Sequence, residues 1–347
     1  MELSKKDTKM TQGLAIISMV VLHLFCRKGA DVYGTPLLWI NDSVPFVYYL
    51  GFLAEICVPL YCLCSGYAHY RLGETNGLTI KRNSKRLLKF LINFWIILVI
   101  FSIVGLIVKS EDIPVSFTEF LGNVFLYKLS YNGAWWFVAT YVLLVSLSFP
   151  LFRLVEKANG ILLFIIMAGQ MLFFWLYDST IKEAISINPF MSILATQFVN
   201  LVGDVLFSYV SGMLIAKYNV VTFIKKKNIK NIWLLMALLL ISIIVCIAEK
   251  AIAMPYYAII VFLVFNSMNK SNAFIKIFDF LGMHSTNIWL VHMFFYLVLF
   301  AGLVQNLKYP LFMFIGMMAI CTAVSYIINL IYKPIVKITL ERKKDEK

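Results

Sequence analysis

The sequence predicts an all-α, polytopic integral membrane protein with about ten transmembrane helices and both termini in the cytoplasm. Apolar residues make up 61% of the 347 residues and charged residues only 14%, a balance that excludes a soluble globular domain. Long apolar stretches recur along the chain, each close to the roughly 17 to 25 residues that a helix needs to cross a bilayer. Basic residues gather in alternate connections between these stretches.

The apolar stretches divide the chain into predicted spans at residues 11–26, 46–70, 87–108, 135–152, 160–177, 196–216, 231–248, 253–268, 284–303 and 310–332. With the N-terminus inside, the cytoplasmic segments hold 24 of the 31 Lys and Arg residues, as the positive-inside rule requires. The net charge of +13 therefore reflects membrane topology. Its dispersal over many short connections argues against a nucleic-acid partner.

We expect residues 1–347 to form a single transmembrane domain, because no connection is long enough for a core of its own. The basic N-terminus and first apolar run imitate a signal peptide but lack a small-residue cleavage pattern, so we expect the run to be retained. The six cysteines lie mostly within spans and favour packing roles, with neither disulfides nor a metal site indicated.

The first span, QGLAIISMVVLHLFC, carries a histidine among aliphatic residues. An ionisable side chain at that depth is costly, which makes His23 a functional candidate, although a lone buried histidine can also serve only as a helix contact. Eleven residues of helix rise about 16 Å, which places His23 near the bilayer midplane and on the same face as Gln12, with Lys9 one turn away. That face suits a ligand entering from the cytoplasm with phosphates at one end.

Other polar residues within spans are candidates for the same interior. His292 enters the ninth span at a depth comparable to that of His23, as a second site histidine or as a helix contact. Glu55 and Asp204 are intramembrane acids that should face inward, where either would orient a histidine, pair with a cation or contact substrate. Trp136 belongs to an AWWF run that fits an interfacial aromatic belt or a platform for sugar rings.

The cytoplasmic end of the second span and the start of the third form another cluster. Ser65, Gly66 and Tyr67 follow VPLYCLC and would line a site or simply let helices approach closely. The run KRNSKRLLK brings Arg82, Lys85 and Arg86 onto neighbouring turns, either as membrane anchors or as a clamp for anionic phosphates.

These motifs, in this order and spacing, resemble the membrane acyltransferase-3 family over nearly the whole chain. The resemblance is carried by His23 eleven residues after a polar position, VPLYCLCSGY, the basic start of the third span, AWWF and FLGMHSTNIWLVH. It points to the stand-alone form, without an appended extracellular esterase-like domain. Family members O-acetylate exported or lipid-linked glycans with cytoplasmic acetyl-CoA, typically as cell-envelope polysaccharide modification.

The resemblance implies that His23 is the catalytic histidine and that Arg82, Lys85 and Arg86 contact the coenzyme phosphates. The family usually has Arg or Lys where this chain has Gln12, so a cationic contact is missing there or is supplied by Lys9. We expect an acyltransferase of the bacterial plasma membrane that needs acetyl-CoA, a glycan or lipid-linked sugar acceptor and surrounding lipid, but no metal. A transporter or flippase for a lipid-linked sugar or small solute is the alternative, with a regulatory membrane protein a third.

Overall fold

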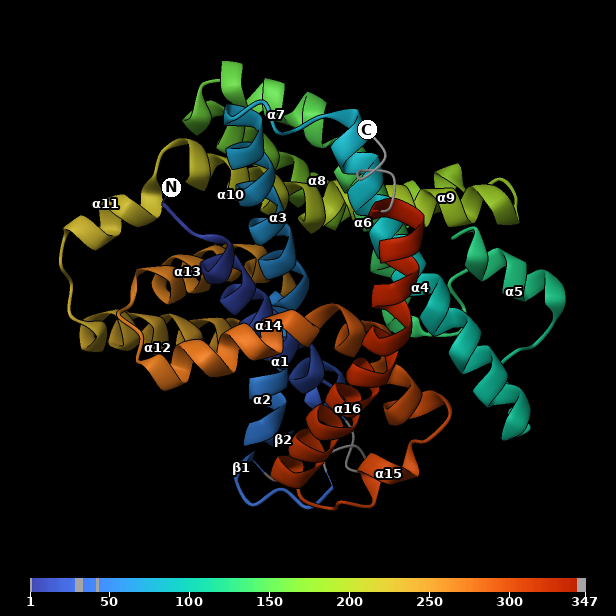
Figure 1. Ribbon diagram of the computed structural model, residues 1–347. Coiled ribbons are helices and arrows are strands. Elements are labelled where there is room, and N and C mark those ends of the chain that lie inside the picture. Colours follow the sequence, from blue (N-terminus) through green and yellow to red (C-terminus); the bar gives the residue numbers. More distant parts are fainter. Residues whose placement is uncertain (1, 29–33, 42–43, 342–347) are drawn as a thin grey trace.

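The computed structural model describes residues 2–28, 34–41 and 44–341, and it is almost entirely helical (Figure 1). The helices and strands are α1 Lys5–Phe25, β1 Trp39–Asn41, β2 Val44–Pro45, α2 Phe46–Leu53, η2 Ala54–Ile56, α3 Cys57–Glu74, α4 Ile80–Ile107, α5 Phe117–Val124, η3 Gly133–Trp135, α6 Trp136–Ser146, α7 Ser148–Lys157, α8 Gly160–Ile185, α9 Pro189–Asn200, η4 Leu201–Val205, α10 Leu206–Lys217, α11 Val220–Lys226, α12 Asn231–Ala248, η5 Ala251–Ala253, α13 Met254–Ser267, α14 Asn272–Met293, η6 Phe294–Val298, α15 Gly302–Gln305, α16 Pro310–Val336 and η7 Lys337–Glu341. Among the described residues, β1 and β2 form a small antiparallel hairpin, and η4, η6 and η7 are π-helical turns.

Within the described part of the chain, seven helices are long and apolar enough to cross a membrane, and the bent pair α6 and α7 makes an eighth. The other two predicted spans correspond to helices that are atypical. One is α13, which has only 14 residues. The other is α14, which begins at Asn272, twelve residues before the predicted start, because Lys276 and Asp279 interrupt the hydropathy without interrupting the helix. The protein is thus an all-α, multi-pass membrane protein.

Contacts between helix ends show that these two atypical helices cross the same layer as the others. On the predicted cytoplasmic side, Asn231 at the start of α12 donates to the carbonyl of Asn269 beyond the end of α13, at 2.8 Å. On the opposite side, Lys28 after α1 pairs with Glu249 after α12 at 2.7 Å. The guanidinium of Arg27 lies 5.4 Å from the ring centre of Tyr296 after α14. Helix ends assigned to one side therefore meet on that side.

The two termini follow the same arrangement. Arg71 at the end of α3 pairs with Glu2 at 3.3 Å, and Lys85 at the start of α4 donates to the carbonyl of Leu340 at 2.8 Å. In Figure 1 both termini and α7 lie in the upper part of the molecule, and the β1–β2 hairpin and α15 lie at the bottom. The two ends of the chain thus lie at the same end of the bundle, in agreement with the even number of spans that the sequence predicted.

Helix α1 lies in the centre of the bundle and packs along α14. The Ser4 side chain accepts the backbone N–H of Asp7 while the Asp7 carboxylate accepts the N–H of Ser4, a capping box that fixes where α1 begins. A Cβ added at Gly13 would collide with the carbonyl of Phe278, and one added at Gly282 would collide with the carbonyl of Lys9. Two glycines thus let the backbones of α1 and α14 touch, as small residues do between membrane helices.

Candidate active site

The glycine crossing of α1 and α14 determines where the two site histidines lie. His23 follows Gly13 by ten residues, and His292 follows Gly282 by ten residues. Both helices run from the cytoplasmic side outward, so ten residues of rise carry both side chains to the same level, roughly 15 Å beyond the crossing. The structure brings the rings into contact, with centroids 4.7 Å apart. The comparable depth that the sequence predicted for the two histidines is confirmed.

Hydrogen bonds assign a proton to one nitrogen of each ring. His292 is fully buried, and its Nδ1 lies 2.7 Å from the carbonyl oxygen of Trp289. Since a carbonyl only accepts, Nδ1 of His292 carries the proton and Nε2 is an acceptor. That Nε2 lies 3.2 Å from Nδ1 of His23, which is also 2.9 Å from the carbonyl of Met19. Nδ1 of His23 therefore donates, and Nε2 of His23 holds the free electron pair.

His23 forms part of the wall of a cavity of about 260 Å³. Glu55 and Trp136, both predicted as lining residues, are in this wall, and so is Trp289. Trp289 is positioned by its indole N–H, which donates to the carbonyl of Ala134 at 3.0 Å, and by Phe137, whose ring centre is 5.5 Å away. The AWWF run thus encloses the cavity by binding to α14 and is more than a membrane-interface belt.

Glu55 lies in η2, the short turn where α2 gives way to α3. The thiol of Cys26, the residue that ends α1, lies 3.6 Å from Oε1 of Glu55, so the carboxylate is held close to the helix turn that carries His23. Asp204, the other predicted intramembrane acid, belongs to the π-helical turn η4, and its side chain lies outside the described part of the structure.

A second cavity, of about 270 Å³, lies at the cytoplasmic end and is basic. Arg71 and Arg86 line it together with Lys5 and Tyr67. The hydroxyl of Tyr67 accepts the backbone N–H of Leu3 at 2.9 Å and so attaches the N-terminus to α3. Tyr67 therefore lines this inner cavity. Thr8 of α1 lines it as well, and Thr8 precedes His23 by fifteen residues along that helix.

The other predicted phosphate contacts are placed differently. Among residues of the basic run, Arg86 faces the inner cavity, whereas Lys85 donates to the carbonyl of Leu340 and Arg82 is exposed. Lys9 donates to the carbonyl of Gly282 at 3.4 Å, and Gln12 is half-buried on α1. The structure thus brings Arg86 to the inner cavity without Arg82 and Lys85.

Ser65 is half-buried on α3, and Gly66 has different surroundings from Tyr67. A Cβ on Gly66 would collide with the backbone carbonyl of Tyr209, and Gly212 of α10 approaches the carbonyl of Leu63 in the same way. This is a second glycine crossing, between α3 and α10. Gly66 is accordingly a packing residue, which was one of the two interpretations of the sequence.

Trp289 and Arg71 are cavity residues that sequence reasoning did not single out. Trp289 stands three residues before His292, so helical spacing relates the two along α14. Arg71 was counted only as part of the basic connection, and its place in the inner cavity depends on the packing of the N-terminus against α3. Among the described residues, no group of three or more His, Cys, Asp or Glu is arranged to hold a metal ion.

Comparison with known proteins adds one result to this geometry. The sequence model of the acyltransferase domain family matches residues 10–330, which is nearly the entire chain and includes both histidines. No curated protein and no solved structure matches the chain. Because the family model covers nearly all of this polytopic helical chain, the chain belongs to the acyltransferase-3 family of membrane acyltransferases.

Proposed function

We propose that the protein transfers an acetyl group from cytoplasmic acetyl-CoA to a hydroxyl group of an exported or lipid-linked glycan at a bacterial plasma membrane. The observation that supports this best is the His23–His292 pair, which leaves the basic nitrogen of His23 on the side of the ring not used by the protein. A neutral sugar hydroxyl is a poor nucleophile and needs a base of this kind.

His23 acts as the general base. Its Nε2 takes the proton of the acceptor hydroxyl while the hydroxyl oxygen attacks the thioester carbonyl carbon. The carbon–sulfur bond then breaks, and the proton passes from Nε2 to the departing coenzyme A thiolate. While Nε2 is protonated, the Nδ1–H continues to donate to the carbonyl of Met19 and to Nε2 of His292, and both acceptors stabilise the imidazolium.

His292 is a positioning residue in this scheme. The carbonyl of Trp289 fixes the proton on Nδ1 of His292, so Nε2 of His292 is always presented to His23 as an acceptor. This holds His23 in the tautomer that a base requires, the same role that a carboxylate has in many hydrolytic triads.

The donor would reach His23 from the inner cavity. Arg71, Arg86 and Lys5 line it, and the guanidinium groups of the two arginines suit phosphate oxygens. Thr8 of α1 lines the same cavity, and the fifteen residues from Thr8 to His23 rise roughly 22 Å. The extended pantetheine arm of coenzyme A is the part of the donor that would cover this distance, with Lys9 and Gln12 along the same helix.

The experiment uses purified protein in lipid nanodiscs with radiolabelled acetyl-CoA and the envelope glycan of cells that lack the protein. We expect labelled glycan with the wild type and none with His23→Ala. His284→Ala is the matched control, because His284 is a buried α14 histidine that contacts Ser325 instead of His23. Near-normal acetylation by His23→Ala contradicts the mechanism. Movement of a lipid-linked sugar across vesicles without acetyl-CoA, and with no labelled glycan, establishes the transporter alternative instead.

A further inference from the structure

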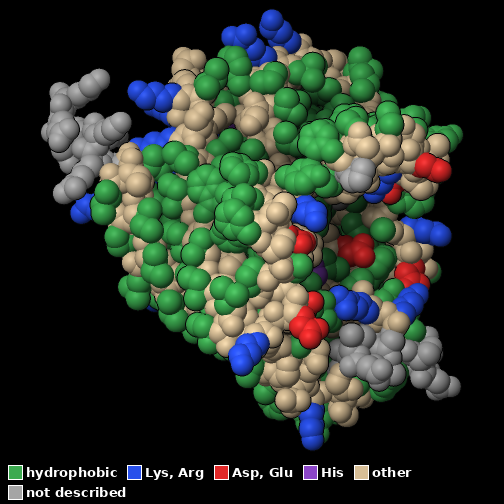
Figure 2. Space-filling view, turned by 90° about the vertical axis from the view of Figure 1, so that its right-hand side faces the viewer, with side chains coloured by type: hydrophobic (Ala, Val, Ile, Leu, Met, Phe, Trp, Pro, Cys, Tyr) green, Lys and Arg blue, Asp and Glu red, His purple; other side chains and the backbone are tan. Residues whose placement is uncertain are grey.

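A third cavity adjoins the one at His23 and is not used by the proposed chemistry. Its volume is about 350 Å³, and Glu55 lines both cavities, so the two meet at that carboxylate. The remaining wall comes from the middle and end of α8, the end of α9, the π-helical turn η4, the turn η5 and the start of α13. Figure 2 shows a hollow on this side of the molecule in which acidic and basic side chains gather around a visible histidine.

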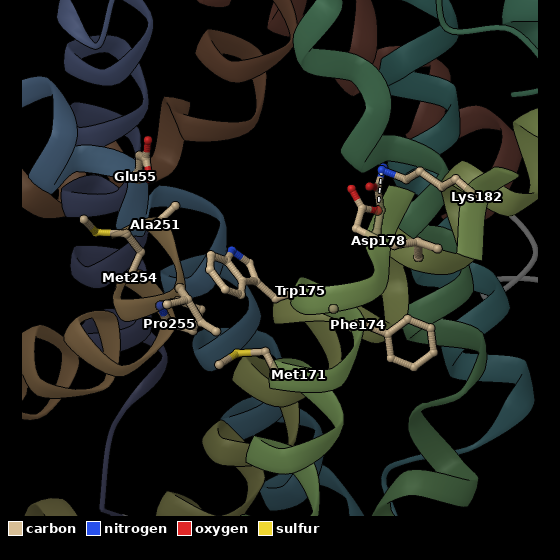
Figure 3. A pocket seen from close by; sticks show the side chains of 13 residues that line it. Glu55, Met171, Phe174, Trp175, Asp178, Lys182, Ala251, Met254 and Pro255 are labelled. Carbon is tan, nitrogen blue, oxygen red and sulfur yellow. Dashed lines mark ion pairs between the residues drawn. The ribbon is translucent and has the colours of Figure 1, made fainter. Parts of the chain in front are cut away.

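The side chains of this third cavity suit a sugar chain. Trp175 lines the cavity and its side chain is 48% exposed, and an indole face of this kind is a surface on which sugar rings stack. Asp178 and Lys182 form an ion pair at 2.7 Å whose outer atoms can bond hydroxyl groups. Figure 3 shows Glu55 on one wall, the Asp178–Lys182 pair on the opposite wall and the indole of Trp175 between them.

The charges in the lining further restrict the class of glycan that the cavity can bind. Among the described side chains, the charged groups of the wall are two carboxylates and one ammonium group, so the cavity disfavours chains that carry phosphate or carboxylate groups. The π-helical turn η4 also contributes Gly203 to the wall, and a Cβ there would meet nothing within 4 Å. Irregular turns of this kind are often found at binding sites.

We propose that this third cavity is a subsite for the sugar units next to the one that is acetylated, and that the acceptor is therefore an uncharged oligosaccharide. This rests on the proposed function. One sugar ring occupies the cavity at His23, between Trp136 and Trp289, and the chain continues past Glu55 onto Trp175. Selectivity for an oligosaccharide over a single sugar then comes from Trp175, far from the reacting atoms.

The test compares acceptors of different length. Envelope glycan from cells lacking the protein is cut and separated into one-sugar and four-sugar fractions, and both are assayed with wild type, Trp175→Ala and Trp175→Phe. We expect Trp175→Ala to raise the KM for the four-sugar fraction about tenfold with kcat unchanged, the loss that one aromatic contact accounts for. The KM for the one-sugar fraction should not change, and Trp175→Phe should retain most of the binding. Trp233→Ala, on the exposed face of α12, is the matched control.

Direct binding of the four-sugar fraction separates this inference from the proposed function. If wild type binds the fraction, Trp175→Ala does not, and no acetyl group is transferred, then the subsite is established and the transferase proposal fails. If acetyl transfer occurs but Trp175→Ala affects both fractions equally, or neither, the subsite is refuted. Tighter binding of a four-unit poly(glycerol phosphate) also refutes it. The four-sugar fraction is offered free and attached to a polyprenyl phosphate, and the better substrate identifies the source of the chain.

Discussion

Replacement of His292 by alanine isolates the contribution of the histidine pair to catalysis. In the wild type, Nε2 of His292 accepts the Nδ1–H of His23 at 3.2 Å, and that bond becomes charge-assisted once His23 is protonated. A hydrogen bond to a charged group contributes about 1.5 to 3 kcal/mol. At 1.36 kcal/mol for each factor of ten, kcat should fall about 10- to 150-fold. The KM for acetyl-CoA should stay unchanged, because His292 is not in the inner cavity.

The assay is steady-state acetyl transfer in nanodiscs, with thermal unfolding of each variant recorded in parallel. His292→Gln supplies the conservative variant, since its side-chain oxygen can occupy the place of Nε2 and should restore part of kcat. A purely structural role for His292 would lower the amount of folded protein without changing kcat per folded molecule. Unchanged kcat in folded His292→Ala, or no difference between the alanine and glutamine variants, would refute the reasoning about the tautomer.

Three further predictions concern packing, charge and the donor. Gly13→Ala should destabilise the fold by about 1 to 3 kcal/mol and lower activity, because its methyl group would press α1 away from α14. Thermal unfolding measures the change. Gly169→Ala is the control and should unfold as the wild type does, because its added Cβ meets nothing within 4 Å. Lys28, by its hydrogen bond, holds the pKa of Glu249 below its usual value of 4.5, so the stabilisation is present at neutral pH and is lost as the pH falls through the folded pKa. Glu249→Gln should therefore unfold at lower temperature than wild type at pH 7, and the two unfolding curves should converge below that pKa. Arg71→Ala should raise the KM for acetyl-CoA about tenfold while Lys157→Ala, at the end of α7, leaves it unchanged.

Much of the fold and the centre of the site could be predicted from the sequence, because membrane insertion imposes strong local rules. Hydropathy and basic residues were sufficient for the all-α architecture, and the rarity of an intramembrane histidine singled out His23. The start of α14 could not be predicted in this way, since a hydropathy window ends at Lys276 whereas the helical hydrogen bonds do not.

The remaining cavity residues could not be predicted because they depend on contacts between distant helices. Trp175 and Asp178 lie on α8, which carries no local pattern that distinguishes a residue facing a cavity from one facing lipid. Arg71 became a cavity residue only because Glu2 and Leu3 pack against the end of α3. Gly13 and Gly282 are a partial exception. Small residues in membrane helices are known to indicate close helix contacts, but the sequence does not show which helix packs against which.

The short length of α13 affects the thickness of the hydrocarbon barrier inside the protein. With the preceding turn η5, α13 forms an apolar helix over Ala251–Ser267 that rises about 26 Å, roughly 4 Å less than a bilayer core. The third cavity lies at the predicted outer end of this helix, where Met254 and Pro255 form part of its wall, so a recess adjoins the shortened helix. For the transfer that we propose, from a cytoplasmic donor to an acceptor on the other side, the recess shortens the apolar distance along this helix. An extra helical turn inserted before Met254 would restore the full barrier and fill the recess.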